Sequence, residues 1–167
     1  EAREKFEEDN VEVKGVILEE EDAGRDMHIS KVVIETENGA KIMGKPKGTY
    51  ITLEAPNMME DDEEYHREIS ATLARIIKQL FPVEKEDCTI LVAGLGNREV
   101  TPDALGPNVV DHLLITRHMI KEFGKYALGE KNTNRISGIV PGVMAQTGME
   151  SLEIIQGIVK ETKPDYL

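Results

Sequence analysis

The residues best suited to chemistry lie in one irregular segment, 94–107, with the sequence GLGNREVTPDALGP. Gly94 and Gly96 lack side chains where the chain must turn sharply beneath a bound group, and Asn97 can brace the loop through side chain–backbone hydrogen bonds. The Thr-Pro pair before Asp103 fixes a local turn and presents this carboxylate in a defined direction. Such a carboxylate could act as a general base, or share a proton with a second carboxylate and activate water to attack an amide.

The spacing alone leaves two roles open for Asp103, because aspartate is more often a hydrogen-bonding turn residue than a catalytic group. Other chemistries fit the segment poorly. Only the first two glycines of a G-x-G-x-x-G dinucleotide motif are present. No G-x-S-x-G nucleophile elbow occurs, and Cys88 lies in an apolar strand segment, where we expect a small buried side chain. The four histidines are scattered, and His112 and His118 point to different helical faces. We therefore expect neither a metal nor a cofactor.

The elements around this loop predict a parallel sheet. An apolar strand, 88–94, leads into the loop, and a helix is expected from Pro107 to about residue 122. A short strand at 136–140, a Gly/Pro loop and a helix at 149–161 follow. This β-α-β-α-β order predicts right-handed crossovers, with ligands bound at the carboxyl ends of the strands. The second loop should then lie beside the first and help to shape the site, through Pro141, Gly142, Thr147 and Gly148.

The region before residue 60 is rich in β-forming residues. Runs at 11–18, 27–36 and 49–54 are separated by turn residues at Asp22-Ala23-Gly24 and around Asn38-Gly39, which is typical of a small antiparallel sheet. From residue 60 to 80 the apolar residues recur at spacings of three and four, which predicts an amphipathic helix. We therefore expect an α/β chain with a β-rich N-terminal region at 1–58, packed on a core that begins at residue 59.

Composition restricts the function classes. With 20 basic and 32 acidic side chains, the net charge of −12 argues against nucleic-acid binding and against an anionic membrane surface. No run of 18 apolar residues and no signal-peptide pattern occurs, so a cytoplasmic location is expected. The sequence has no initiator Met, and its last residues resemble the start of a new strand. We therefore expect a fragment or a processed chain.

Long segments of the sequence resemble the spore germination protease family. These are GLGNREVTPDALGPNVVDHLLITRHM (94–119) and SGIVPGVMAQTGMESLEIIQGIVKETKPDYL (137–167), with the shorter runs KGVIL, GTYITLEAP and YHREIS before them. Members are endopeptidases of endospore-forming bacteria that degrade small acid-soluble spore proteins during germination. The resemblance implies an atypical aspartic protease without a cofactor, made as a zymogen. It also implies a homotetramer in the spore core, and cleavage beside a glutamate of the substrate.

The resemblance also implies a fold and a set of site residues. The fold would be a three-layer parallel-sheet core, similar to hydrogenase maturation proteases and phosphorylases, of which residues 59–167 form the first part. Asp103 matches one of two aspartates that the family needs. The second lies in an Ile-Asp-Ala-Leu motif beyond the end of this chain, and Asp165 matches a residue that begins a strand. We therefore expect this fragment to be inactive alone. Arg117 and His118 are candidates for recognising the acidic residue of the substrate, since arginine suits carboxylates.

Three alternatives stay open from the sequence. Hydrogenase maturation proteases also place a G-x-G-N loop after a first strand, and their acidic residue senses nickel in the client protein. Peptidyl-tRNA hydrolases carry Gly-Leu-Gly-Asn and a later Thr-Arg-His, both present here, but they need a basic surface that a net charge of −12 opposes. The third alternative is a fragment that acts only in assembly.

Overall fold

The computed structural model of the protein describes residues 14–81, 87–124, 126, 128, 129 and 133–167. The chain divides into two compact units, residues 1–82 and 83–167. The helix α3 (Glu63–Leu80) belongs to the first unit, whereas the sequence placed the boundary in front of this helix, between residues 58 and 59. Both units combine helices with a sheet, so the chain is α/β, as predicted.

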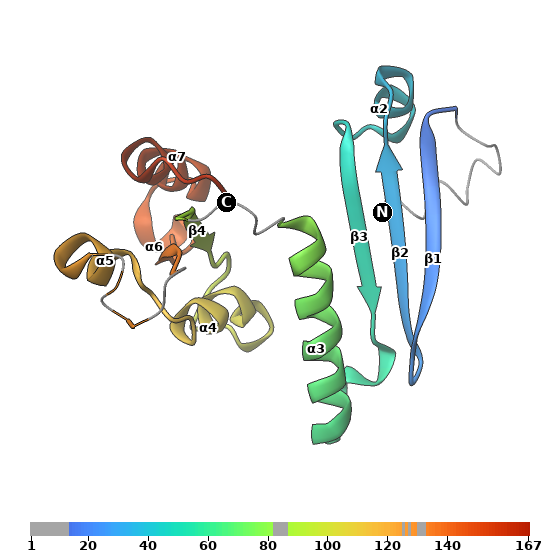
Figure 1. The fold of residues 1–167 in the computed structure, drawn as a ribbon, viewed down its shortest axis with the longest axis horizontal. Coiled ribbons are helices and arrows are strands. Elements are labelled where there is room, and N and C mark those ends of the chain that lie inside the picture. Colours follow the sequence, from blue (N-terminus) through green and yellow to red (C-terminus); the bar gives the residue numbers. More distant parts are fainter. Residues whose placement is uncertain (1–13, 82–86, 125, 127, 130–132) are drawn as a thin grey trace. The chain divides into compact units, whose positions relative to one another are not determined.

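The first unit contains a three-stranded antiparallel sheet in the order β1 (Val16–Gly24), β2 (Met27–Ile34) and β3 (Gly48–Glu54) (Figure 1). The predicted small antiparallel sheet is therefore confirmed. The first strand starts and ends later than the expected 11–18, of which residues 11–13 lie outside the described residues. The expected turn at Asp22-Ala23-Gly24 is wrong, because these residues are the end of β1. The hairpin turn is made by Arg25 and Asp26, with φ of 45° and 63°. Two left-handed residues suit the right-handed twist of the flanking strands.

The expected turn at Asn38-Gly39 is wrong, because these residues lie inside a helix, α2 (Glu37–Met43). Thr36 caps this helix by accepting a hydrogen bond from the Gly39 N–H at 3.1 Å. Gly44 ends it in the left-handed conformation, with φ of 62°. Met43 is fully buried and packs in a cluster of apolar residues that also contains Val16, Val32 and Ile34. Burial of this apolar surface holds α2 on one face of the sheet.

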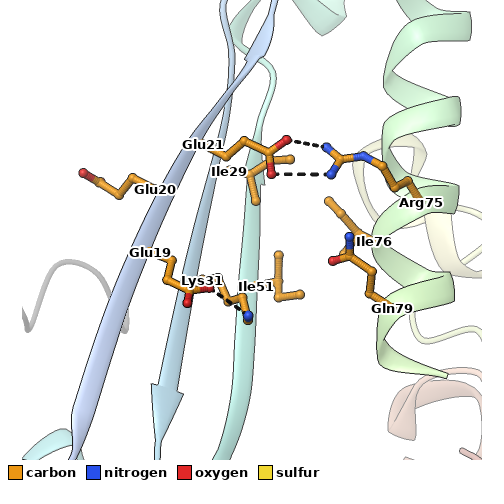
Figure 2. A pocket seen from close by; sticks show the side chains of 9 residues that line it. All are labelled: Glu19, Glu20, Glu21, Ile29, Lys31, Ile51, Arg75, Ile76 and Gln79. Atoms are coloured by element: carbon orange, nitrogen blue, oxygen red, sulfur yellow. Dashed lines mark hydrogen bonds and ion pairs between the residues drawn. The ribbon is translucent and has the colours of Figure 1, made fainter. Parts of the chain in front are cut away.

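The other face of the sheet is covered by α3, whose first turn is capped by the Asp62 carboxylate. Side chains alternate between the faces of a strand, so Ile29 points away from the side that carries Val32. Ile29 and Ile76 line a small cavity between the sheet and α3 (Figure 2). At its rim, the Arg75 guanidinium donates hydrogen bonds to the Glu21 carboxylate of β1 at 3.0 and 3.4 Å. The predicted amphipathic helix is thus confirmed.

The second unit is built on two parallel strands, β4 (Thr89–Ala93) and β5 (Arg135–Ile139). On the edge of β4 away from β5, Ile90 forms a parallel bridge with Tyr166. The predicted parallel pairing of the strands is confirmed. Helices α4 (Leu105–Asp111) and α7 (Ser151–Thr162) contact β4, and α5 (Arg117–Phe123) contacts β5. The Gly/Pro loop after β5 contains a single helical turn, α6 (Met144–Thr147).

The single helix expected from Pro107 to residue 122 is wrong, since α4 and α5 are separate. Pro107 is the third residue of α4, not the first. The break is caused by Thr116, which pairs with the start of β5. Its N–H donates to the Ile136 carbonyl at 3.1 Å, and its hydroxyl accepts from the Ile136 N–H at 2.9 Å. This non-local pairing competes with the helical hydrogen bonds of the same segment.

The interior of the second unit contains Leu91, Thr116 and Cys88, each with a relative exposure of 2%. Cys88 is therefore the small buried side chain that its strand context predicted. Among the described residues, no helix is both long and apolar enough to cross a bilayer.

Candidate functional site

The loop that carries Asp103 begins where β4 ends and folds back on itself. The Gly94 N–H donates to the Ile139 carbonyl at 2.9 Å, which extends the pairing of β4 with β5 into the loop. The Asn97 N–H donates to the Asp103 carbonyl at 3.0 Å, and the Asp103 N–H donates to the Val100 carbonyl at 2.8 Å. Both backbone polar groups of Asp103 are thus bonded within the loop, so the position of its Cα is fixed by local hydrogen bonds.

Two glycines permit this tight path. Gly96 has φ of +132°, and a Cβ at this position would lie 2.0 Å from the Asp103 carbonyl oxygen. A Cβ on Gly94 would lie 2.3 Å from the carbonyl oxygen of Gly106. Neither distance is possible for a real side chain, so the two glycines are needed for the loop to pack against itself. This gives a physical reason for the shaping role predicted for both residues.

Asn97 connects the first loop to the second. Its side-chain oxygen accepts hydrogen bonds from the Glu99 N–H at 3.0 Å and from Nε2 of Gln146 at 3.2 Å. Gln146 lies in α6, which follows β5. The two loops therefore lie side by side at the carboxyl ends of the parallel strands, where open α/β sheets bind ligands. Gln146 was missed by the sequence reasoning, which considered the Gly, Pro and Thr residues of this segment.

The four residues predicted in the second loop shape its backbone. Pro141 is buried, and Gly142 and Gly148 have positive φ of 74° and 70°. The Thr147 hydroxyl donates to the Met149 carbonyl at 3.0 Å and accepts from the N–H of the same residue at 3.2 Å. These contacts are internal to the loop, so a direct contact of the four residues with a substrate stays a prediction.

Asp103 is exposed and lines a mostly apolar hollow of about 380 Å³. Leu95 and Leu105, which also line the hollow, are 58% and 69% exposed. Within the part of the chain that the structure describes, the Asp103 carboxylate has neither a hydrogen-bond partner nor an ion-pair partner. Its oxygens are therefore accessible to water and to a polar group of a ligand that lies along the hollow.

An ion pair that the sequence reasoning missed holds the loop to α4. Nη2 of Arg98 donates to Oδ1 of Asp111 at 2.8 Å, and Nη1 donates to Oδ2 of the same carboxylate. This two-point contact lowers the pKa of Asp111 and raises the pKa of Arg98, mainly through the hydrogen bonds between them. Both oxygens of the Asp111 carboxylate are thus bonded to Arg98. The sequence signal that could have indicated this ion pair is a basic residue in the loop, Arg98, and an acidic residue in the segment that follows, Asp111.

Arg117 and His118 are not brought together with Asp103. They follow Thr116, which is bonded to Ile136 at the amino end of β5, whereas the two loops lie at the carboxyl ends of the strands. Their role in recognising an acidic side chain stays a prediction. Asp165 also lies away from the loops, because its carboxylate accepts a hydrogen bond from the Thr89 N–H at the start of β4. This agrees with the sequence interpretation that Asp165 begins a strand.

No metal centre can be assembled from the described residues, because no group of three or more His, Cys, Asp or Glu lies close enough together to hold an ion. The arrangement instead places the exposed Asp103 on a hydrogen-bonded loop, next to an apolar surface. Chemically, such a group can accept a proton from water or donate one to a leaving group.

A family model described as germination protease matches residues 1–167. Among curated proteins, the chain is 44% identical over 167 residues to the germination protease of Caldanaerobacter subterraneus subsp. tengcongensis, covering 100% of this chain and 50% of that protein. It is 41% identical to the germination protease of Clostridium tetani, covering 100% of this chain and 51% of that protein. It is 39% identical over 159 residues to the germination protease of Bacillus subtilis, covering 93% of this chain and 42% of that protein.

The chain thus spans about half the length of the curated relatives that it matches. The family model covers every residue, including both loops and Asp103. The chain therefore belongs to the germination protease family.

Proposed function

We propose that this chain is part of an endopeptidase of bacterial spores, which starts the degradation of small acid-soluble spore proteins during germination. The observation that carries the proposal is the Asp103 loop, which presents an accessible carboxylate over an apolar hollow at the carboxyl end of a parallel strand. The membership of the germination protease family supports the peptidase activity.

The proposed mechanism is of the aspartic type. An ionised carboxylate takes a proton from a water molecule, whose oxygen attacks the carbonyl carbon of the peptide bond. A second, protonated carboxyl group gives its proton to the carbonyl oxygen. The first carboxyl group then passes its proton to the leaving nitrogen, the C–N bond breaks, and the second carboxylate regains a proton from a hydroxyl group of the tetrahedral intermediate. Two carboxyl groups that share one proton suit this reaction, because two carboxyl groups at short distance cannot both ionise.

Asp103 would be one member of the pair, and the second would lie outside this chain. The pairing of Tyr166 with Ile90 supports this arrangement, because it is parallel and lies on the side of β4 that does not face β5. A strand that continued from Tyr166 would run parallel to β4. Its carboxyl end would therefore lie next to Gly94, at the carboxyl end of β4. On this basis we also propose that the second unit, residues 83–167, contributes to a three-layer parallel-sheet core of the hydrogenase-maturation-protease type. The chain would then be inactive by itself.

The remaining features of the proposed enzyme follow the resemblance to its family. They are a zymogen that is activated by processing, a homotetramer, action in the cytoplasm of the spore core, and cleavage beside a glutamate of the substrate. None of them requires a cofactor. A net charge of −12 is compatible with a protein partner and disfavours binding to nucleic acid.

The proposal is tested with the full-length, processed protein and a purified small acid-soluble spore protein as substrate. Asp103→Asn keeps the shape of the side chain but removes its ability to exchange a proton. We expect kcat to fall by about 10²- to 10⁴-fold, the range typical of general acid–base catalysis. Asp61→Asn, the same change at an exposed position in the first unit, is the matched control.

Two results would contradict the proposal in different ways. Retained activity of the Asp103→Asn variant would refute the catalytic assignment. A wild-type enzyme that cleaves other proteins, but leaves the spore protein intact, would refute the substrate.

A further inference from the structure

The orientation of two carboxamide groups is fixed by the hydrogen bonds between the loops. The side-chain atom of Asn97 that faces the Glu99 N–H must be its oxygen, because a backbone N–H can only donate. The Gln146 atom that faces this oxygen must then be the NH₂ group, Nε2, at 3.2 Å. This leaves the Gln146 oxygen to face the Val143 N–H, at 3.5 Å. Two backbone donors thus set the polarity of the link, with Gln146 as donor and Asn97 as acceptor.

The same asparagine is bonded to the backbone of Asp103. The Asn97 N–H donates to the Asp103 carbonyl at 3.0 Å. Gly96 packs so closely against the same carbonyl oxygen that a Cβ at this position would overlap it. A movement of Asn97 must therefore move Asp103. Gln146 restrains Asn97 from the second loop, which is attached to a different strand of the sheet.

We propose that Gln146 is a positioning residue for Asp103: by donating to Asn97 it holds the Asp103 loop in register with the loop after β5. This inference rests on the proposed function, in which Asp103 takes part in proton transfer. Gln146 itself does not line the hollow beside Asp103. It is also exposed, so replacing it leaves no cavity in the core.

The test compares three substitutions of Gln146 in the full-length, processed protease, with a small acid-soluble spore protein as substrate. Gln146→Leu removes both polar functions, Gln146→Glu presents only acceptors at neutral pH, and Gln146→Lys presents only donors. The control is Gln156→Leu, the same change at an exposed position of α7. For each variant kcat and KM are measured well below the temperature of unfolding, and the unfolding midpoint is recorded.

We expect Gln146→Leu to lower kcat about tenfold while KM stays within about twofold, because a small misplacement of a catalytic group affects the chemical step more than ground-state binding. Gln146→Glu should lower kcat at least as much, since its carboxylate would face the Asn97 oxygen. Gln146→Lys should recover most of the kcat lost in Gln146→Leu, because its ammonium group can still donate to Asn97. A role limited to the stability of α6 would not rank the leucine, glutamate and lysine variants in this order.

Two outcomes would overturn the inference while the proposed function stands. One is a kcat of Gln146→Leu and Gln146→Glu within twofold of wild type, in an enzyme that Asp103→Asn inactivates. The other is an equal loss of kcat in all three Gln146 variants, which would show that the polarity of the link does not matter. If Asp103→Asn is fully active instead, the proposed function fails and the positioning role fails with it.

Discussion

Replacing Gly96 by alanine should damage both the stability and the activity of the protein, and the size of the effect can be estimated from the loop. At φ of +132°, Gly96 has a backbone conformation that an alanine adopts only with strain, which costs about 1–3 kcal/mol. The new Cβ would also lie 2.0 Å from the Asp103 carbonyl oxygen. Overpacking of this kind costs about a further 1–3 kcal/mol. We therefore expect Gly96→Ala to lower the free energy of unfolding by about 2–6 kcal/mol.

The same steric conflict displaces the candidate catalytic residue. The Asp103 carbonyl must move by about 1 Å before its contact with the new methyl group even reaches 3.0 Å, the shortest distance that real Cβ atoms show. A displacement of about 1 Å at a catalytic group can reduce the rate about 10²-fold. We expect a loss of kcat of this order in Gly96→Ala, at temperatures where the variant is still folded.

Substitution of two other glycines separates the effect of backbone strain from the effect of steric overlap. Gly148 has φ of +70°, and a Cβ added at this position would have nothing within 4 Å, so Gly148→Ala tests backbone strain alone, at about 1–2 kcal/mol. Gly157 lies within α7 with open space around it, so Gly157→Ala should stabilise the protein by about 0.5–1 kcal/mol. Urea unfolding and initial-rate assays on the full-length protein give both quantities. If Gly96→Ala is no more destabilising than Gly148→Ala and keeps its kcat, the packing argument is refuted.

Two further predictions concern charged residues. The pKa of Asp111 is lowered by the hydrogen bonds from Arg98, so the stability that this ion pair contributes is complete above the usual aspartate pKa of about 3.9 and is lost as the pH falls through the lowered value. The difference in unfolding free energy between wild type and Asp111→Asn should therefore be constant above about pH 5 and shrink below about pH 4; urea titrations in which it grows on acidification would refute this. Arg117→Ala should leave kcat/KM within about twofold of the wild-type value, because this residue lies near the amino end of β5, whereas Asp103 lies at the carboxyl ends of the strands. A tenfold rise in KM for the spore protein would instead support the recognition role predicted from the sequence.

Local patterns predicted several of the elements. The apolar run before Gly94, the amphipathic spacing from residue 60 to 80, and the parallel pairing of the two strands of the second unit all appear in the structure. The helix at Glu37–Met43 was missed because Asn-Gly is a strong turn signal in isolation. Here the cap from Thr36 and the burial of Met43 outweigh that local preference.

The features that could not be predicted depend on residues that are distant in the sequence. The segment between α4 and α5 leaves the helical path because Thr116 pairs with Ile136, which lies 20 residues further on. Gln146 acquires its role only through Asn97, 49 residues earlier. A periodicity or a turn motif reports on neighbours within a few residues, so neither contact leaves a signal in such patterns. The positions of both loops, by contrast, followed from the parallel sheet alone.

The aspartates of the second unit differ in how their carboxylates are bonded. Four occur between residues 87 and 167. Asp87 is paired with Arg135, Asp111 with Arg98, and Asp165 accepts from a backbone N–H. Each of these contacts occupies a carboxylate oxygen of the aspartate. Asp103 has no such contact within the described residues, although hydrogen bonds of its own N–H and C=O fix its backbone. A proton-transfer group needs this combination, because its position must be constant while its oxygens stay free for water and substrate.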